Sequence, residues 1–218
     1  MTKQRLRVHS VSMSVDGYAA GPNQTEAQPM GEGGEHLHDW VFETPFGKRM
    51  IGEDESTVGP SVDNDLLEKG FDNLGAWVLG RNMFGPVRGQ WGDSDWKGWW
   101  GDDPPYHCNV FVLTHHAHDP IEMQGGTVFY FVTDGIESAL QQAFAAADGK
   151  DVRLGGGSST IQQYLAAGLV DEMHIAIVPI LLGGGERLFG AVDVSAAGYR
   201  VVERIESTNV THVRIGRM

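Results

Sequence analysis

The sequence contains only one cysteine, Cys108, so no disulfide can form within the chain. Sparse cysteine is typical of proteins from reducing compartments. The chain also lacks any apolar run of about 18 residues, the length that a membrane-spanning helix needs. Residues 1–7 include no apolar stretch of signal-peptide length. We therefore expect a cytoplasmic protein with no membrane partner.

Basic residues are scarce, since 16 Lys and Arg stand against 29 Asp and Glu, a formal net charge of −13. Nucleic acid and anionic lipid both require a basic surface, so neither is an expected partner. A small phosphorylated ligand remains compatible, because it needs only local donors. The 218 residues, 41% of them hydrophobic, carry no internal repeat or linker. We therefore predict one globular domain over residues 1–218.

Short apolar runs bounded by Gly, Thr or Asp recur along the chain, as in the buried strands of a parallel sheet. They cover residues 76–79, 110–113, 128–132 and 152–154. Residues 6–14 alternate apolar and polar side chains, the pattern of a strand with one buried face. Helices are expected at 38–48, 136–147, 159–167 and 63–74, the last with Asp63 as a candidate N-cap.

This alternation of strands and helices predicts an α/β fold with crossover connections and a mostly parallel sheet. The pattern changes after residues 171–182. Residues 199–206 and 210–217 alternate apolar and polar side chains and are joined by a short turn. The sheet is therefore expected to end in an antiparallel hairpin.

The first candidate binding segment is the glycine-rich stretch at 154–160, between a predicted strand and a predicted helix. Gly155, Gly156 and Gly157 allow backbone N–H groups to approach a phosphate, and the helix N-terminus adds favourable donors. The segment is neither a Walker A loop nor a full G-x-G-x-x-G. The alternative interpretation is a tight turn with Ser158 or Ser159 as the helix cap.

Two further segments also follow predicted strands. In residues 79–85, Gly80 permits close approach and Arg81 offers a planar fork of donors for phosphate. Open α/β sheets bind ligands at such strand ends, although taken singly the segment fits a solvated loop arginine somewhat better. In residues 112–116, the hydroxyl of Thr114 and the imidazoles of His115 and His116 could hold a phosphate monoester.

The histidines also allow a metal site, which would be formed by His115, His116 and His118 with His107 and Cys108. Zinc ligands usually occur as spaced pairs, whereas these histidines are adjacent, so the spacing favours the phosphate interpretation.

Asp16 ends the first predicted strand and could bind a heterocyclic substrate or hold a proton for transfer. Its alternative role is a simple Asp-Gly turn with Gly17. Residues 90–101 combine four tryptophans with glycines, which suggests a lid or a partner surface. The glycine loop at 183–185 is expected to border the same site. Because the carboxyl ends of parallel strands meet at one edge of a sheet, these segments should converge.

The segments resemble a known family in their order and spacing. The resemblance rests on residues 14–20, 80–84, 155–159 followed by 169–173, and 179–189. Together they are similar to bacterial proteins related to dihydrofolate reductase and to the C-terminal reductase domain of the bifunctional riboflavin-biosynthesis enzyme. The resemblance covers essentially the whole chain.

The resemblance implies a three-layer dihydrofolate-reductase-like fold of about eight strands, NADPH as hydride donor, and a homodimer. It places Asp16 on the substrate side. The cofactor contacts that it implies are Ala19, Gly80, Arg81, Asn82, Met83, Thr114, His115, His116, Gly155, Gly156, Gly157, Ser158, Ser159 and Thr160. The chain departs from the family in having Met83 where a hydroxyl would help bind phosphate. The zinc deaminase half of the bifunctional enzyme is absent, as is an acidic proton-relay residue of dihydrofolate-reductase type.

The sequence therefore predicts an NADPH-dependent reductase that transfers a hydride to a small pyrimidine- or pterin-like heterocycle. In such an enzyme the cofactor carries the chemistry, and the protein orients both rings. A second hypothesis is an NADPH-binding sensor without turnover. A third is metal-dependent hydrolysis through the histidines.

Overall fold

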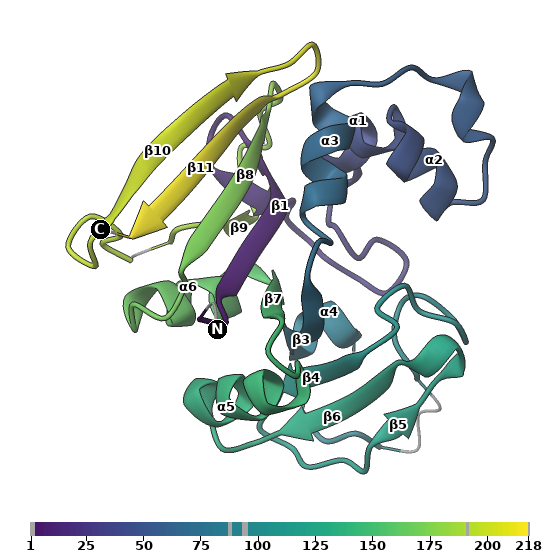
Figure 1. Ribbon diagram of the computed structural model, residues 1–218, viewed down its shortest axis with the longest axis vertical. Helices are drawn as coiled ribbons and strands as arrows, with labels where there is room; N and C mark the ends of the chain where they lie inside the picture. Colours follow the sequence, from purple (N-terminus) through teal and green to yellow (C-terminus); the bar gives the residue numbers. More distant parts are fainter. Residues whose placement is uncertain (1–2, 87–88, 93–95, 191, 218) are drawn as a thin grey trace. The chain divides into compact units, whose positions relative to one another are not determined.

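The computed structural model describes residues 3–86, 89–92, 96–190 and 192–217 (Figure 1). The chain divides into two compact units. The first unit comprises Met1–Val8 and Asn73–Asp171, and the second comprises His9–Asp72 and Glu172–Met218. The expectation of one domain over residues 1–218 stays a prediction.

Within the described residues, nine strands follow the hydrogen-bonded order β10-β11-β8-β1-β7-β3-β4-β6-β5. In this order, the neighbouring strands β1, β7, β3, β4 and β6 pair in parallel. The pairs at the two ends, β10 with β11, β11 with β8, and β6 with β5, are antiparallel. This arrangement confirms the predicted α/β class, the mostly parallel sheet and the terminal hairpin, with nine strands where about eight were expected.

The first unit is a parallel sheet with helices (Figure 1). Its strands are the start of β1 (Leu6–Ser14), β7 (Asp151–Gly156), β3 (Leu74–Gly80), β4 (Asn109–Leu113), β6 (Val128–Val132) and the short antiparallel β5 (Ile121–Glu122). Its helices are α4 (Arg81–Phe84), α5 (Ile136–Ala146) and α6 (Ser158–Ala166), with a short 3-10 helix at Gln124–Gly126. Helix α5 packs on β3, β4 and β7. Apolar runs form these strands because their side chains are buried in the sheet, as for Val110, Val112 and Leu154.

Aromatic side chains from α4 and from the segment between α4 and β4 pack on this sheet. The Phe84 ring lies edge-on to Phe129 with 5.1 Å between ring centroids, and the Tyr106 ring lies edge-on to Trp77 at 5.0 Å. Edge-to-face contacts of this kind add to the burial of apolar area.

The second unit contains the rest of β1 with β8 (Glu172–Val178), β11 (Thr211–Arg217) and β10 (Tyr199–Glu206). A separate small sheet pairs β2 (Tyr18–Ala20) with β9 (Glu186–Arg187). The helices are α1 (Asp39–Phe42), α2 (Pro45–Met50) and α3 (Val62–Lys69), with 3-10 turns at Gly34–His38 and Glu55–Thr57. The core of the unit is formed by Leu37, Trp40, Leu67, Ala176, Val178 and Val210.

Two helix predictions differ from the structure. The helix expected over 38–48 is two short helices, because Thr44 caps α2 with its side chain and Pro45 begins that helix. Helix α3 begins at Val62 with Ser61 as its cap and ends at Lys69, so Asp63 is not the cap. No helix among the described residues is long and apolar enough to cross a membrane.

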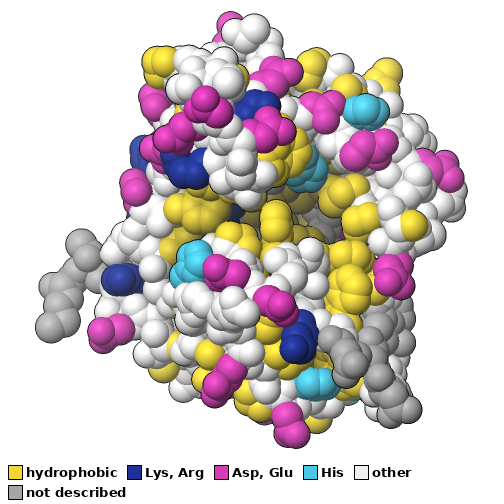
Figure 2. Space-filling model, turned by 90° about the vertical axis from the view of Figure 1, so that its right-hand side faces the viewer, with side chains coloured by type: hydrophobic (Ala, Val, Ile, Leu, Met, Phe, Trp, Pro, Cys, Tyr) yellow, Lys and Arg dark blue, Asp and Glu magenta, His cyan; other side chains and the backbone are white. Residues whose placement is uncertain are grey.

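Acidic side chains lie at many points of the face shown in Figure 2, and basic side chains at few. This distribution agrees with the net charge of −13. A bound anion would therefore depend on donors placed locally.

Candidate functional site

Three strands of the first unit end level with one another. Gly80 of β3 is in register with Leu113 of β4, and Leu79 is in register with Gly156 of β7. The segments that follow therefore emerge at the same edge of the sheet, as expected from the sequence. We call the residues gathered there the strand-end cluster; its members are Gly80, Arg81, Met83, Thr114, His116, Gly156 and Thr160.

Gly80 and Gly156 allow the close packing of this cluster. A Cβ atom on Gly80 would overlap the Thr160 hydroxyl of α6, so no larger residue fits without movement. Gly156 has φ of 110°, a conformation that favours glycine, and its peptide bond to Gly157 is cis. Met83 lies beside the turn, with its Sδ 3.7 Å from the position of a Cβ on Gly156. The turn after β7 and the residues after β3 thus touch.

Arg81 joins the β3 end to the β4 end. Its Nη1 donates to the Thr114 hydroxyl oxygen at 2.9 Å, and the backbone N–H of His116 donates to the same oxygen at 3.1 Å. Thr114 is buried, whereas Arg81 is partly exposed. The guanidinium is therefore held at the sheet edge with solvent access, as binding of an anion requires.

Helix α6 begins directly after the glycine turn. Its N-cap is Gly157, and no side chain caps the helix. The alternative that Ser158 or Ser159 serves as the cap is therefore wrong. An N-terminus without a side-chain cap presents backbone N–H groups and the positive end of the helix dipole. A Cβ on Gly155 would overlap the Leu79 side chain, so that glycine also reflects close packing.

Trp91 belongs to the same region, although the sequence analysis did not assign it to the cofactor site. The Arg81 guanidinium carbon lies 3.0 Å from the centroid of a Trp91 ring, and the indole Nε1 donates to the His116 carbonyl oxygen at 2.7 Å. Trp91 and Trp96 are half-buried rather than exposed. Residues 93–95 of the predicted lid lie outside the described residues.

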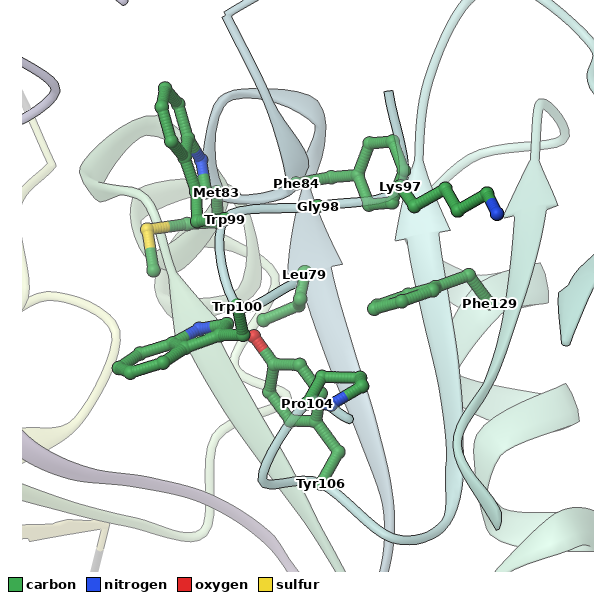
Figure 3. Close-up of a pocket in the computed structure, with 10 residues that line it drawn as sticks. All are labelled: Leu79, Met83, Phe84, Lys97, Gly98, Trp99, Trp100, Pro104, Tyr106 and Phe129. Atoms are coloured by element: carbon green, nitrogen blue, oxygen red, sulfur yellow. The ribbon is translucent and has the colours of Figure 1, made fainter. Parts of the chain in front are cut away.

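A tightly filled aromatic pocket adjoins the cluster through Leu79 and Met83 (Figure 3). The Tyr106 hydroxyl points toward Trp100, which is 49% exposed. Burial raises the pKa of Tyr106 to about 12, although the Trp100 side chain hydrogen-bonds to it. The phenol therefore stays protonated at neutral pH.

The remaining predicted cofactor residues of this unit, Asn82 and His115, are exposed on the surface next to the cluster. His118 packs its ring against Trp91 at 4.8 Å between centroids. Among the described residues, no group of three or more His, Cys, Asp or Glu side chains is placed to hold a metal ion.

Asp16 and Ala19 belong to the second unit. The Asp16 carboxylate accepts hydrogen bonds from the Ser14 hydroxyl at 2.6 Å, from the Gly183 N–H at 2.7 Å and from the Leu182 N–H at 3.2 Å. The Ser14 hydroxyl first, and then the two N–H groups, lower the pKa of Asp16 to about 2. Asp16 is thus an anion at neutral pH, which suits it to accept hydrogen bonds from a ligand and not to donate a proton.

The surroundings of Asp16 combine apolar and cationic side chains. Val15 is 61% exposed and Leu181 is 75% exposed, and the Val15 N–H donates to the Ile180 carbonyl oxygen at 3.0 Å. The Arg187 guanidinium carbon lies 4.5 Å from the centroid of the Tyr18 ring, and Arg187 donates to the Asp16 carbonyl oxygen at 3.3 Å. Gly183 of the glycine loop contacts Asp16 directly through its N–H, and the expectation that this loop borders the same site as the strand ends stays a prediction.

The chain matches the family model of the RibD C-terminal domain over residues 8–216. It is 49% identical over 92 residues to the uncharacterized protein YyaP of Bacillus subtilis (strain 168), a match that covers 40% of this chain and 48% of that protein. The match therefore spans about half the length of that curated relative.

Two solved structures share the fold over nearly the whole chain. A deaminase/5-amino-6-(5-phosphoribosylamino)uracil reductase from Thermotoga maritima is 15% identical with a TM-score of 0.58, covering 99% of this chain and 57% of that one. A pyrimidine reductase-like protein from Corynebacterium diphtheriae is 16% identical with a TM-score of 0.54, covering 99% and 92%. At these identities the structural matches show the fold alone. Together with the family match, they confirm the resemblance drawn from the sequence motifs.

Proposed function

Because the chain belongs to the RibD C-terminal domain family, we propose that it is an NADPH-dependent reductase acting on a small pyrimidine- or pterin-like heterocycle. The observation that carries the proposal is the strand-end cluster, in which Arg81, Thr114 and the start of α6 meet at one sheet edge. NADPH carries three phosphate groups, and these residues supply the donors that phosphates need.

The donor set fits such a cofactor in kind. The partly exposed Arg81 guanidinium offers charge-assisted hydrogen bonds. The start of α6 offers backbone N–H groups, as at many pyrophosphate sites. Gly156, without a side chain, leaves room for close approach to the turn. In a chain of net charge −13, these local donors oppose an unfavourable background field.

When bound, NADPH supplies the hydride, and the protein's part is binding and orientation. Asp16 is proposed to anchor the substrate by accepting hydrogen bonds from ring or exocyclic N–H groups, with Val15 and Leu181 as exposed apolar neighbours. Aminopyrimidines and pterins present such donors beside a flat apolar ring. Ala19, on β2, is proposed to contact the cofactor.

A second candidate function is NADPH binding without turnover. The three hydrogen bonds that the Asp16 carboxylate accepts, from Ser14, Leu182 and Gly183, favour it, because a carboxylate held as an anion supplies no proton to a substrate. NADPH oxidation with any member of a panel of pyrimidines and pterins would separate the two functions. Oxidation above the substrate-free rate supports the reductase; tight binding without it supports the sensor.

The test of the proposed site is Arg81→Ala, with dissociation constants for NADPH and NADH. The two cofactors differ only in the 2′-phosphate, and one lost charge-assisted contact of roughly 1.5–3 kcal/mol corresponds to about 10- to 150-fold weaker NADPH binding. NADH binding should hardly change. Arg200→Ala, at an exposed arginine of β10, is the control and should leave both constants unchanged.

Equal losses for both cofactors would place Arg81 on the pyrophosphate instead. If the unmodified protein shows no preference for NADPH over NADH, the proposed role of Arg81 is wrong. Failure to bind either cofactor would overturn the proposed function as a whole.

A further inference from the structure

Trp91 closes a ring of interactions around the guanidinium of Arg81. Arg81 donates to the Thr114 hydroxyl oxygen at 2.9 Å, which in turn accepts from the His116 N–H at 3.1 Å. The His116 carbonyl oxygen accepts from the Trp91 indole N–H at 2.7 Å, and the Trp91 ring stacks on Arg81 at 3.0 Å. Four residues from three separate segments thus depend on one another.

Trp91 is itself fixed by aromatic neighbours. Its ring lies edge-on to Phe131 and His118, with 4.8 Å between centroids in each case, and edge-on to Phe84 at 5.8 Å. Phe84 is buried in the core of the first unit. The indole is therefore a firm platform for Arg81, connected to the sheet through packed rings.

A guanidinium that stacks through its face keeps its N–H donors in its own plane. The contact with Trp91 therefore holds the face, while in the plane Nη1 donates to the Thr114 hydroxyl oxygen at 2.9 Å and Nη2 to the Gly89 carbonyl oxygen at 3.4 Å, so the position of the whole group is fixed. A free arginine side chain would have to lose its rotamer freedom on binding, at the expense of affinity. A stacked arginine has lost much of that freedom beforehand.

We propose that Trp91 is a positioning residue that holds Arg81 for recognition of the 2′-phosphate and thereby sets the preference for NADPH over NADH. The inference rests on the proposed function, since it deepens the role of the same cluster. Trp91 acts through Arg81 and need not touch the cofactor itself.

The experiment compares Trp91→Leu and Trp91→Phe with the unmodified protein in binding of NADPH and NADH. Trp91→Leu removes both the ring face and the indole N–H, and should weaken NADPH by about 3- to 30-fold with little effect on NADH, given the usual strength of cation–π contacts. Trp91→Phe keeps a ring face and should recover part of the loss. In an Arg81→Ala background, Trp91→Leu should have no further effect on NADPH.

Trp100→Leu, at an exposed tryptophan of the same segment, is the matched control and should preserve the NADPH preference. A merely structural role of Trp91 predicts equal weakening of both cofactors, or the same loss with and without Arg81; either result would overturn the inference.

A ligand-free readout separates this inference from the proposed function. In arginine-labelled protein, the Nε–H resonance of Arg81 should show a ring-current shift that Trp91→Leu abolishes and Trp100→Leu does not. If the shift is present but NADPH does not bind, the proposed function fails and the specificity role fails with it. If NADPH binds with preference but the shift is absent, only the role of Trp91 is overturned.

Discussion

The imidazoles of His174 and His212 are hydrogen-bonded to each other in the core of the second unit, with Nε2 of His174 3.0 Å from Nδ1 of His212. Both rings are fully buried. The Ser10 N–H donates to Nδ1 of His174 at 3.3 Å, so the proton of His174 lies on Nε2 and points to His212. His212 must then carry its proton on Nε2, which lies 2.7 Å from Asp63 Oδ1.

Asp63→Ala should therefore destabilise the protein. The change leaves the buried Nε2–H of His212 without its acceptor, a loss of about 1–3 kcal/mol in the free energy of unfolding. Asp65→Ala is the matched control, because Asp65 lies in the same first turn of α3 but is exposed. Urea unfolding of the three proteins measures the difference, and equal losses for the two variants would show that only the helix dipole is involved.

The hydrogen bond between His212 and Asp63 shows why helix boundaries were harder to predict than strands. Ser61 and Asp63 are both residues of N-cap type, and the local sequence does not choose between them. The choice depends on the bond from Asp63 to His212, which lies 149 positions further along the chain. The buried strands could be predicted without knowledge of distant contacts, because the apolar composition of runs such as 110–113 and 128–132 is sufficient.

The candidate site likewise contains residues that the sequence predicts and one that it does not. The convergence of Gly80, Arg81 and Thr114 was predictable, because parallel strands end at a common edge. The contribution of Trp91 was not, because it comes from a polar, glycine-rich segment without periodicity. The clustered tryptophans were its only signal, and on a glycine-rich segment they indicate a lid or a partner surface rather than a contact with Arg81. Packing of Trp91 on Phe84, Arg81 and Phe131 is a tertiary property.

Cys108 should react slowly with thiol reagents. Burial raises the pKa of its thiol to about 11, although the nearby Lys150 acts in the opposite direction. At pH 8 the thiolate fraction, and hence the rate of alkylation, should be roughly 100-fold lower than for a thiol with the ordinary value near 9. Iodoacetamide labelling followed by mass spectrometry gives the rate, and Lys150→Met should slow it further. A native rate equal to the rate in denaturant would contradict the prediction.

Gly80→Ala should destabilise the first unit through contact with Thr160. A Cβ on Gly80 would overlap the Thr160 hydroxyl, and overpacking of this kind typically lowers stability by about 1–3 kcal/mol. The loss should shrink in a Thr160→Ala background, because the overlapping atom is then gone. Gly59→Ala is the control, since no atom lies within 4 Å of that Cβ position. Urea midpoints of the five proteins measure these losses. If Gly80→Ala costs as much stability in the Thr160→Ala background as without it, the strain does not come from contact with Thr160.

Asp16 should titrate far below an ordinary aspartate. Its hydrogen bonds stabilise the ionised form and lower its pKa from 3.8 to about 2, so the stability that they contribute is fully present above about pH 4 and is lost as the pH falls through about 2. The carboxyl carbon of Asp16, followed by NMR, should show this midpoint directly. Ser14→Ala removes the largest cause of the shift and should raise the midpoint toward 3.8, whereas Ser138→Ala, at a partly exposed serine of α5, should leave it unchanged. An Asp16 midpoint near or above 4 in the unmodified protein would show that these hydrogen bonds do not hold the carboxylate, and only a midpoint above about 6 would restore Asp16 as a candidate proton donor at neutral pH. A low midpoint requires the proton for the proposed reduction to come from another group or from solvent.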